Sequence, residues 1–61
     1  MSKLSDDMLK YRAINRISQQ ELATRVGVSL QTINTVENGT QEPSRITAEK
    51  IRQVIYKTED R

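Results

Sequence analysis

Apolar residues recur at helical spacing in several short segments of this chain. The most regular pattern lies toward the C-terminus, where Ala48, Ile51, Val54 and Ile55 occupy positions i, i+3, i+6 and i+7. This spacing puts the side chains on one face of a helix. The pattern therefore predicts a helix over about residues 45–57 that buries one stripe.

The first segment predicts a helix that begins after a cap at Ser5 and ends at about Asn15. Asp6 and Asp7 follow the serine, and acidic side chains in a first turn are favoured by the helix dipole. The apolar residues of this segment form a less clean stripe than those of the last helix. The residues that we expect on its buried face are Leu4, Met8, Tyr11 and Ile14.

Two helices joined by a glycine turn are predicted in the middle of the chain. Ser18 is the expected N-cap of the first, and Glu21 three residues later completes a capping-box pattern. Gly27 supplies the positive φ angle that ends this helix, and Ser29 caps the next one, over about residues 30–38. The apolar residues expected to face inward here are Leu22, Ala23, Val26, Val28, Ile33 and Val36.

A loop follows from Gly39, because Pro43 disfavours a helical conformation at the residue before it. Ser44 or Thr47 then caps the last helix. The elements together predict an all-α fold, a compact bundle of four short helices that forms a single domain over residues 1–61. At this length one core supplies only about 3–5 kcal/mol.

The chain contains no cysteine and no histidine, so it lacks thiolate metal ligands and the commonest general base. Its capping serines have no base to activate them. We therefore expect no catalytic residue, no metal site, no cofactor and no small-molecule ligand, and the chain is not expected to be an enzyme. No apolar run is long enough to cross a bilayer, which predicts a cytoplasmic protein without membrane association.

Ten Lys and Arg residues against eight Asp and Glu leave a net charge of only +2. Most basic residues flank residues 17–39, which contain Arg25 as their one cation, and four of the eight acids, Asp6, Asp7, Glu59 and Asp60, lie near the two chain ends. A solvated surface is the simpler explanation for most of these charges. Net charge by itself therefore does not identify a partner.

The predicted helix over 30–38 has an unusual outer face that carries no charge and many hydrogen-bonding groups. Threonine is a poor helix former, so its repeated use on an exposed helical face costs stability. A binding function explains this composition, and a weakly optimised surface is the alternative. The residues of this face are Ser29, Leu30, Gln31, Thr32, Asn34 and Thr35.

Several short motifs also occur in a characteristic order. They are Ile17-Ser18-Gln19-Gln20-Glu21-Leu22-Ala23, Val26-Gly27-Val28-Ser29, Thr32-Ile33, Val36-Glu37-Asn38-Gly39 and Pro43-Ser44. Over about residues 8–55 the chain therefore resembles the Cro and phage-repressor type of helix-turn-helix domain. The resemblance implies a lambda-repressor-like bundle of about five helices, with a helix-turn-helix core at about 18–38. The fifth helix would fall beyond Arg61.

The resemblance further implies that the third helix lies in the major groove of double-stranded DNA, usually in a dimer on a near-palindromic operator. The amide of Gln31 suits a bidentate contact to adenine, and Leu30 and threonine methyl groups suit the thymine methyl, which predicts A·T-rich half-sites. This helix contains no arginine, so a bidentate arginine contact to guanine is excluded for it. The expected base contacts are Ser29, Leu30, Gln31, Thr32 and Thr35.

Phosphate contacts must come from the flanks, because the third helix has no cation. The start of the second helix offers free backbone N–H groups and the positive end of the helix dipole. The expected phosphate contacts are Arg16, Gln19, Gln20, Asn38 and Arg45. Plain solvent exposure is an equally good explanation for the two arginines.

In the family that this chain resembles, an arginine of the first helix pairs with a glutamate near the end of the third. The matching residues here are Arg12 and Glu37, which are expected to form a structural ion pair.

The leading functional prediction is a sequence-specific transcriptional regulator, a phage- or plasmid-type repressor or Cro-like switch protein that associates with the nucleoid when bound. The alternative is a protein-interaction module, such as an antitoxin or a modulator of another repressor. A homodimer is expected at least on DNA, with Tyr56 and its neighbours as the candidate surface.

Overall fold

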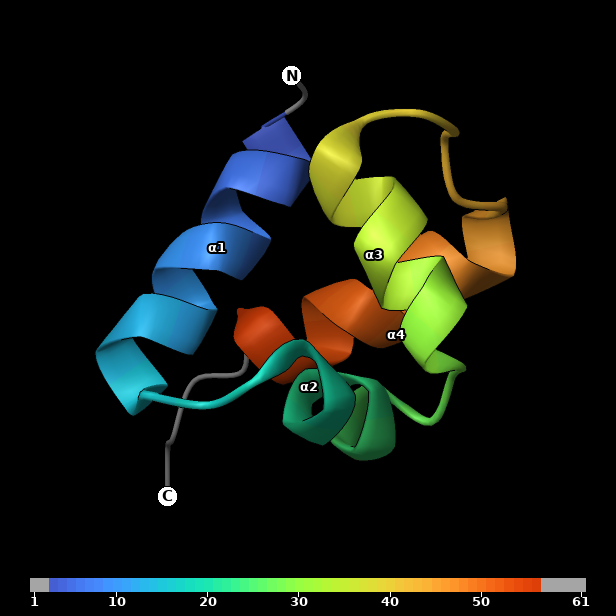
Figure 1. The fold of residues 1–61 in the computed structure, drawn as a ribbon. Coiled ribbons are helices and arrows are strands. Elements are labelled where there is room, and N and C mark those ends of the chain that lie inside the picture. The colour runs from blue at the N-terminus through green and yellow to red at the C-terminus, as the bar shows by residue number, and fades with distance from the viewer. Residues whose placement is uncertain (1–2, 57–61) are drawn as a thin grey trace.

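The computed structural model describes residues 3–56, which form four helices, α1 (Lys3–Asn15), α2 (Gln19–Val26), α3 (Leu30–Asn38) and α4 (Arg45–Ile55). In Figure 1, α1 lies at the left and α3 at the right, with α4 and α2 below them, and α1 contacts α3 directly. The predicted all-α bundle of four helices is confirmed. A fifth helix, and the predicted end of the last helix at residue 57, lie outside the described residues.

Each helix contributes one large, fully buried apolar side chain to a common core. These side chains are Met8 of α1, Leu22 of α2, Ile33 of α3 and Ile51 of α4. Burying a side chain of this size contributes about 1.5–3 kcal/mol. The predicted inward faces of α2, α3 and α4 are confirmed by further buried residues, Ala23, Val26, Val36 and Ala48.

The prediction that Ser5 caps the first helix is wrong. Helix α1 begins at Lys3, and Ser5 lies inside it with no exposed surface. The longer helix lets Leu4 pack against the core. Burial of a helical face stabilises a helix more than local preference does, so packing outweighs the capping tendency of the serine.

Ile14 was also predicted on the buried face of this helix, and that prediction is wrong because 80% of the residue is exposed. Met8 lies at the centre of the buried face. At about 100° per residue, the position six residues later lies about 120° away from that centre. Ile14 therefore points to solvent, although Leu4 and Tyr11 pack against the core as expected.

The predicted caps Ser18 and Ser29 are confirmed, and of the two alternatives for the last helix, Ser44 and Thr47, the structure shows Ser44 as the cap. The hydroxyl oxygens of Ser18, Ser29 and Ser44 each accept a hydrogen bond from the backbone N–H three residues later, at 3.1 to 3.2 Å. Gly27 and Gly39 end α2 and α3 with φ angles of 89° and 75°. The three-residue turn from Gly27 to Ser29 therefore joins two helices with well-defined ends.

Arg16 ends α1 in the same left-handed region, with a φ angle of 57°. Its backbone N–H donates to the carbonyl of Ala13 at 3.3 Å, and that of Ile17 donates to Arg12 at 3.1 Å. This is the Schellman arrangement, which usually places glycine where Arg16 stands. The sequence contains no glycine or asparagine at this position that would predict the left-handed conformation.

The two ends of the described chain are linked by side chains of α1 and the end of α4. The hydroxyl of Tyr56 donates to the carboxylate of Asp7, which also pairs with Lys3 at 3.2 Å. The tyrosine hydrogen bond and then the lysine lower the pKa of Asp7. The carboxylate in turn raises the pKa of Tyr56.

Candidate nucleic-acid interface

The outer face of α3 is held on the surface by the packing of its inner face. Ile33 and Val36 are buried in the same core cluster as Leu22 and Val26 of α2. On the other side of α3, Leu30, Gln31 and Asn34 are exposed, and Thr32 and Thr35 are half-buried. The structure therefore leaves the outer face of the second helix of a helix-turn-helix pair uncovered. A recognition helix enters the major groove with such a face.

Three of the expected base-contacting residues already use their hydroxyl groups within the protein. The hydroxyls of Ser29 and Thr32 share a hydrogen bond of 2.9 Å, and that of Thr35 donates to the carbonyl of Thr32 at 3.1 Å. These contacts fix the side chains of the first turns. The methyl groups of the two threonines and the remaining lone pairs of all three hydroxyls are what these residues can still offer to DNA.

Leu30 and Gln31 lie exposed in the first turn of α3. Leu30 has 43% of its surface exposed, and the amide of Gln31 has no hydrogen-bond partner within residues 3–56. An unengaged amide has both a donor and an acceptor to offer to a base edge. Gln31 is therefore the side chain of α3 best prepared for a bidentate contact.

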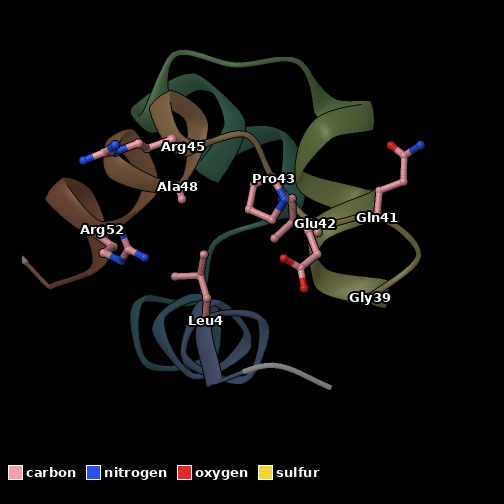
Figure 2. A pocket seen from close by; sticks show the side chains of 9 residues that line it. Leu4, Gly39, Gln41, Glu42, Pro43, Arg45, Ala48 and Arg52 are labelled. Atoms are coloured by element: carbon pink, nitrogen blue, oxygen red, sulfur yellow. The ribbon is translucent and has the colours of Figure 1, made fainter.

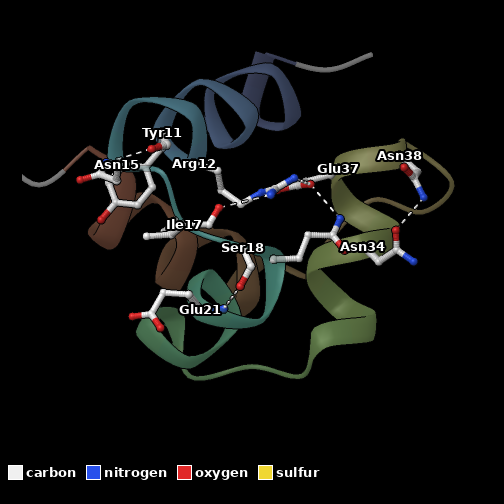
Figure 3. Close-up of polar contacts among 10 residues, drawn as sticks. Tyr11, Arg12, Asn15, Ile17, Ser18, Glu21, Asn34, Glu37 and Asn38 are labelled. Carbon is white, nitrogen blue, oxygen red and sulfur yellow. Dashed lines mark hydrogen bonds and ion pairs between the residues drawn. The ribbon is translucent and has the colours of Figure 1, made fainter.

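Asn34 lies three residues beyond Gln31, so the two side chains stand on neighbouring turns of α3. Its amide oxygen accepts a hydrogen bond from Asn38 at 2.9 Å, as Figure 3 shows. This bond orients the Asn34 amide, whose NH₂ group stays free to donate. The sequence prediction named Asn38 as a phosphate contact and did not include Asn34 among the base contacts.

Arg12, Gln19 and Glu37 form a hydrogen-bonded group that joins three helices (Figure 3). The guanidinium of Arg12 donates from Nε and Nη2 to the two carboxylate oxygens of Glu37, both at 2.9 Å. The amide of Gln19 donates to the same carboxylate at 2.9 Å. Only 3% of Glu37 is exposed, so these bonds satisfy a charge that burial would otherwise penalise.

Three of the expected phosphate contacts are exposed on different elements. Arg16 is exposed in the turn between α1 and α2, Gln20 is exposed in the first turn of α2, and Arg45 is exposed at the first position of α4. The side chain of Gln19, by contrast, is half-buried and bound to Glu37. Its contribution to a phosphate site would have to come from its backbone N–H.

The only cation inside the 17–39 segment, Arg25, pairs within the protein. It donates to the hydroxyl of Tyr11 at 3.0 Å and to Glu21 at 3.3 Å. These bonds, the one to Tyr11 first, raise the pKa of Arg25. The Glu21 half of the predicted capping box is therefore wrong, because the carboxylate of Glu21 pairs with Arg25 in the last turn of α2, and the capping bond that the structure shows is the one to Ser18.

A shallow cavity of about 420 Å³ lies on another side of α3, between the start of α1 and the start of α4. Figure 2 shows Leu4 of α1 pointing toward Ala48 of α4, with Pro43 and the carboxylate of Glu42 at the edge. Arg45 and Arg52 also line it. It is separate from the outer face of α3 that carries Gln31.

No helix within residues 3–56 is long and apolar enough to span a membrane. The same part of the chain holds no group of acidic side chains placed to bind a metal ion together. The groups that this surface offers are amides, methyls and flanking guanidiniums.

Comparison with known proteins identifies relatives of this fold. A helix-turn-helix family matches residues 8–56 of the chain. An uncharacterised HTH-type transcriptional regulator of Methanocaldococcus jannaschii is 43% identical over 51 residues, which cover 82% of this chain and 77% of that protein. No solved structure gives a significant match.

Proposed function

Because this chain belongs to the helix-turn-helix family of the Cro and phage-repressor type, we propose that it is a sequence-specific transcriptional regulator, a phage- or plasmid-type repressor or Cro-like protein. Helix α3 enters the major groove of double-stranded operator DNA. The observation that carries the proposal is the outer face of α3, which is uncharged and carries the exposed, unengaged amide of Gln31 in its first turn. The protein acts in the cytoplasm, where it binds the nucleoid.

Base reading is assigned to the first turns of α3. Gln31 pairs with N6 and N7 of an adenine, and the side chain of Leu30 contacts a thymine methyl group. Thr32 and Thr35 add methyl contacts, and the hydroxyls of Ser29, Thr32 and Thr35 add single hydrogen bonds beside them. This set favours A·T-rich half-sites, because it contains no arginine for a bidentate guanine contact.

Phosphate binding is assigned to groups on both sides of α3. These are the side chains of Arg16, Asn38 and Arg45 and the free N–H groups at the start of α2, at Gln19 and Gln20. If about 3 to 4 phosphates are neutralised per subunit, the slope of log K against log[salt] is roughly −3 for a monomer and about twice that for a dimer.

The test begins with selection of bound sequences from a random pool of duplex DNA. We expect a consensus with A·T pairs at the contacted positions, and a gel shift with that duplex that Gln31→Ala weakens by about 1–3 kcal/mol. Gln53→Ala, on the exposed part of α4, is the matched control and should bind as the unchanged protein does. A consensus dominated by G·C pairs would overturn the assignment of the base contacts.

Absence of specific binding even at low salt would overturn the regulator proposal and favour a protein-interaction module, such as an antitoxin or a modulator of another repressor. We also propose that the chain acts as a homodimer on DNA, with recognition helices about 34 Å apart. Sedimentation with and without the selected duplex measures this. A single chain per duplex at saturation would contradict the dimer.

A further inference from the structure

The pair of helices α2 and α3 is connected at both of its ends. The turn from Gly27 to Ser29 joins the C-terminus of α2 to the N-terminus of α3. At the opposite ends, the side chain of Gln19, the first residue of α2, donates to Glu37 in the last turn of α3 at 2.9 Å. The two helices also share the buried core, and the connection from Gln19 to Glu37 adds a restraint on the angle between them at the end away from the turn.

The acceptor in this second connection is itself rigid. Glu37 is 3% exposed and is held from the other side by two bonds from Arg12 of α1, each of 2.9 Å. Arg12 also donates to the carbonyl of Ile17, just before α2, at 3.4 Å. The position of the carboxylate is therefore fixed relative to all three helices. A side chain that binds it, as that of Gln19 does, is held in place by the same bonds.

We infer that Gln19 is a positioning residue, whose side chain acts on DNA binding by fixing α2 against α3 and does not itself touch DNA. This inference rests on the proposed function and refines the phosphate contact expected at Gln19. One N–H of the amide is bonded to Glu37 and holds the side chain toward the protein, so we assign phosphate binding to the backbone N–H groups at Gln19 and Gln20. Groove contacts from α3 and phosphate contacts from α2 then meet the duplex together, which requires a fixed angle between the helices.

A double-mutant cycle tests this assignment. Gln19→Met keeps the length of the side chain and removes its amide. Arg12→Met with Glu37→Met removes the acceptor and leaves no unpaired buried charge, a replacement that buried ion pairs often tolerate. Gln53→Met on α4 is the control for an exposed glutamine.

We expect Gln19→Met to weaken binding to the selected duplex by roughly threefold to tenfold in the unchanged protein and by less than about twofold in the background without Arg12 and Glu37. Gln53→Met should leave the affinity unchanged in both backgrounds. An equal loss in both backgrounds would mean that the Gln19 side chain contacts DNA directly, and the inference would be wrong. The affinities are compared at a temperature at which circular dichroism shows every variant fully folded.

NMR of the unchanged protein supplies a readout that does not depend on the folding of any variant. On addition of the duplex, the side-chain amide protons of Gln19 should shift little, while its backbone N–H and that of Gln20 shift strongly. A side-chain shift as large as that of Gln31 would overturn the inference and leave the proposed function intact. Absence of any specific duplex binding by the unchanged protein would overturn both.

Discussion

Arg16 occupies a backbone conformation that the other two turns of this type give to glycine. Its φ angle is 57°, against 89° for Gly27 and 75° for Gly39. For a residue with a Cβ atom the left-handed region costs roughly 1–2 kcal/mol. Arg16 nevertheless keeps a long cationic side chain at this strained position, and we assign that side chain to phosphate binding. The combination suggests that the arginine is there for function and not for stability.

Arg16→Gly should therefore stabilise the fold and weaken DNA binding. Relief of strain exceeds the added entropy of the unfolded chain, for a net gain of about 0.5–1 kcal/mol, or a few degrees in the melting temperature. The salt slope of operator binding should fall by about one per subunit. Arg16→Ala is the control, because it removes the charge and keeps the strain. A lower melting temperature, or unchanged affinity, for Arg16→Gly would contradict this explanation.

At the scale of single helices, the elements form where the local signals are strong. Ser18, Ser29 and Ser44 could be identified as caps from sequence because a cap acts within three residues, and each makes the expected bond. Helix α1 lacks such a signal, and its apolar residues form no regular stripe. Its start at Lys3 and the exposure of Ile14 depend on packing against other helices, which local pattern does not contain.

Ser44→Ala tests the contribution of a cap to α4. The hydroxyl accepts from the N–H of Thr47 at 3.2 Å, and its loss should cost about 1 kcal/mol, or roughly 4–8 °C in the melting temperature of a domain of this size. Ser44→Asp, which keeps an acceptor at the start of the helix, should retain most of the stability. Thermal melts followed by circular dichroism measure both. Equal losses in the two variants would show that the hydroxyl is not the stabilising group.

At the scale of the whole molecule, the contacts that sequence reasoning missed join residues far apart in the chain. Gln19 meets Glu37 across 18 positions, and Tyr56 meets Asp7 across 49. No local sequence pattern around Gln19 or Tyr56 indicates which distant residue its side chain will bind. Tyr56 was considered only as a surface for a second copy, whereas the structure uses its hydroxyl to join the end of α4 to α1.

The link between Asp7 and Tyr56 makes stability depend on pH in a defined direction. The tyrosine hydrogen bond, and then Lys3, lower the pKa of Asp7 from its usual 3.8. A carboxylate with a lowered pKa stabilises the fold above its unfolded value, and that contribution is lost as the pH falls through the folded value. The same bond raises the pKa of Tyr56 above its usual 10.0, so the tyrosine contribution is lost only as the pH rises through that higher value.

Tyr56→Phe should therefore lower the melting temperature at neutral pH, where the carboxylate is charged and the phenol is not. The difference between the variant and the unchanged protein should shrink well below pH 3.8, where Asp7 becomes protonated, and also well above pH 10.0, where the tyrosine ionises. Tyr11→Phe is the matched control, because the hydroxyl of Tyr11 accepts from Arg25, which stays charged over the acid range. A Tyr56→Phe difference that stays constant from neutral to acid pH would show that the hydroxyl does not stabilise the fold through Asp7.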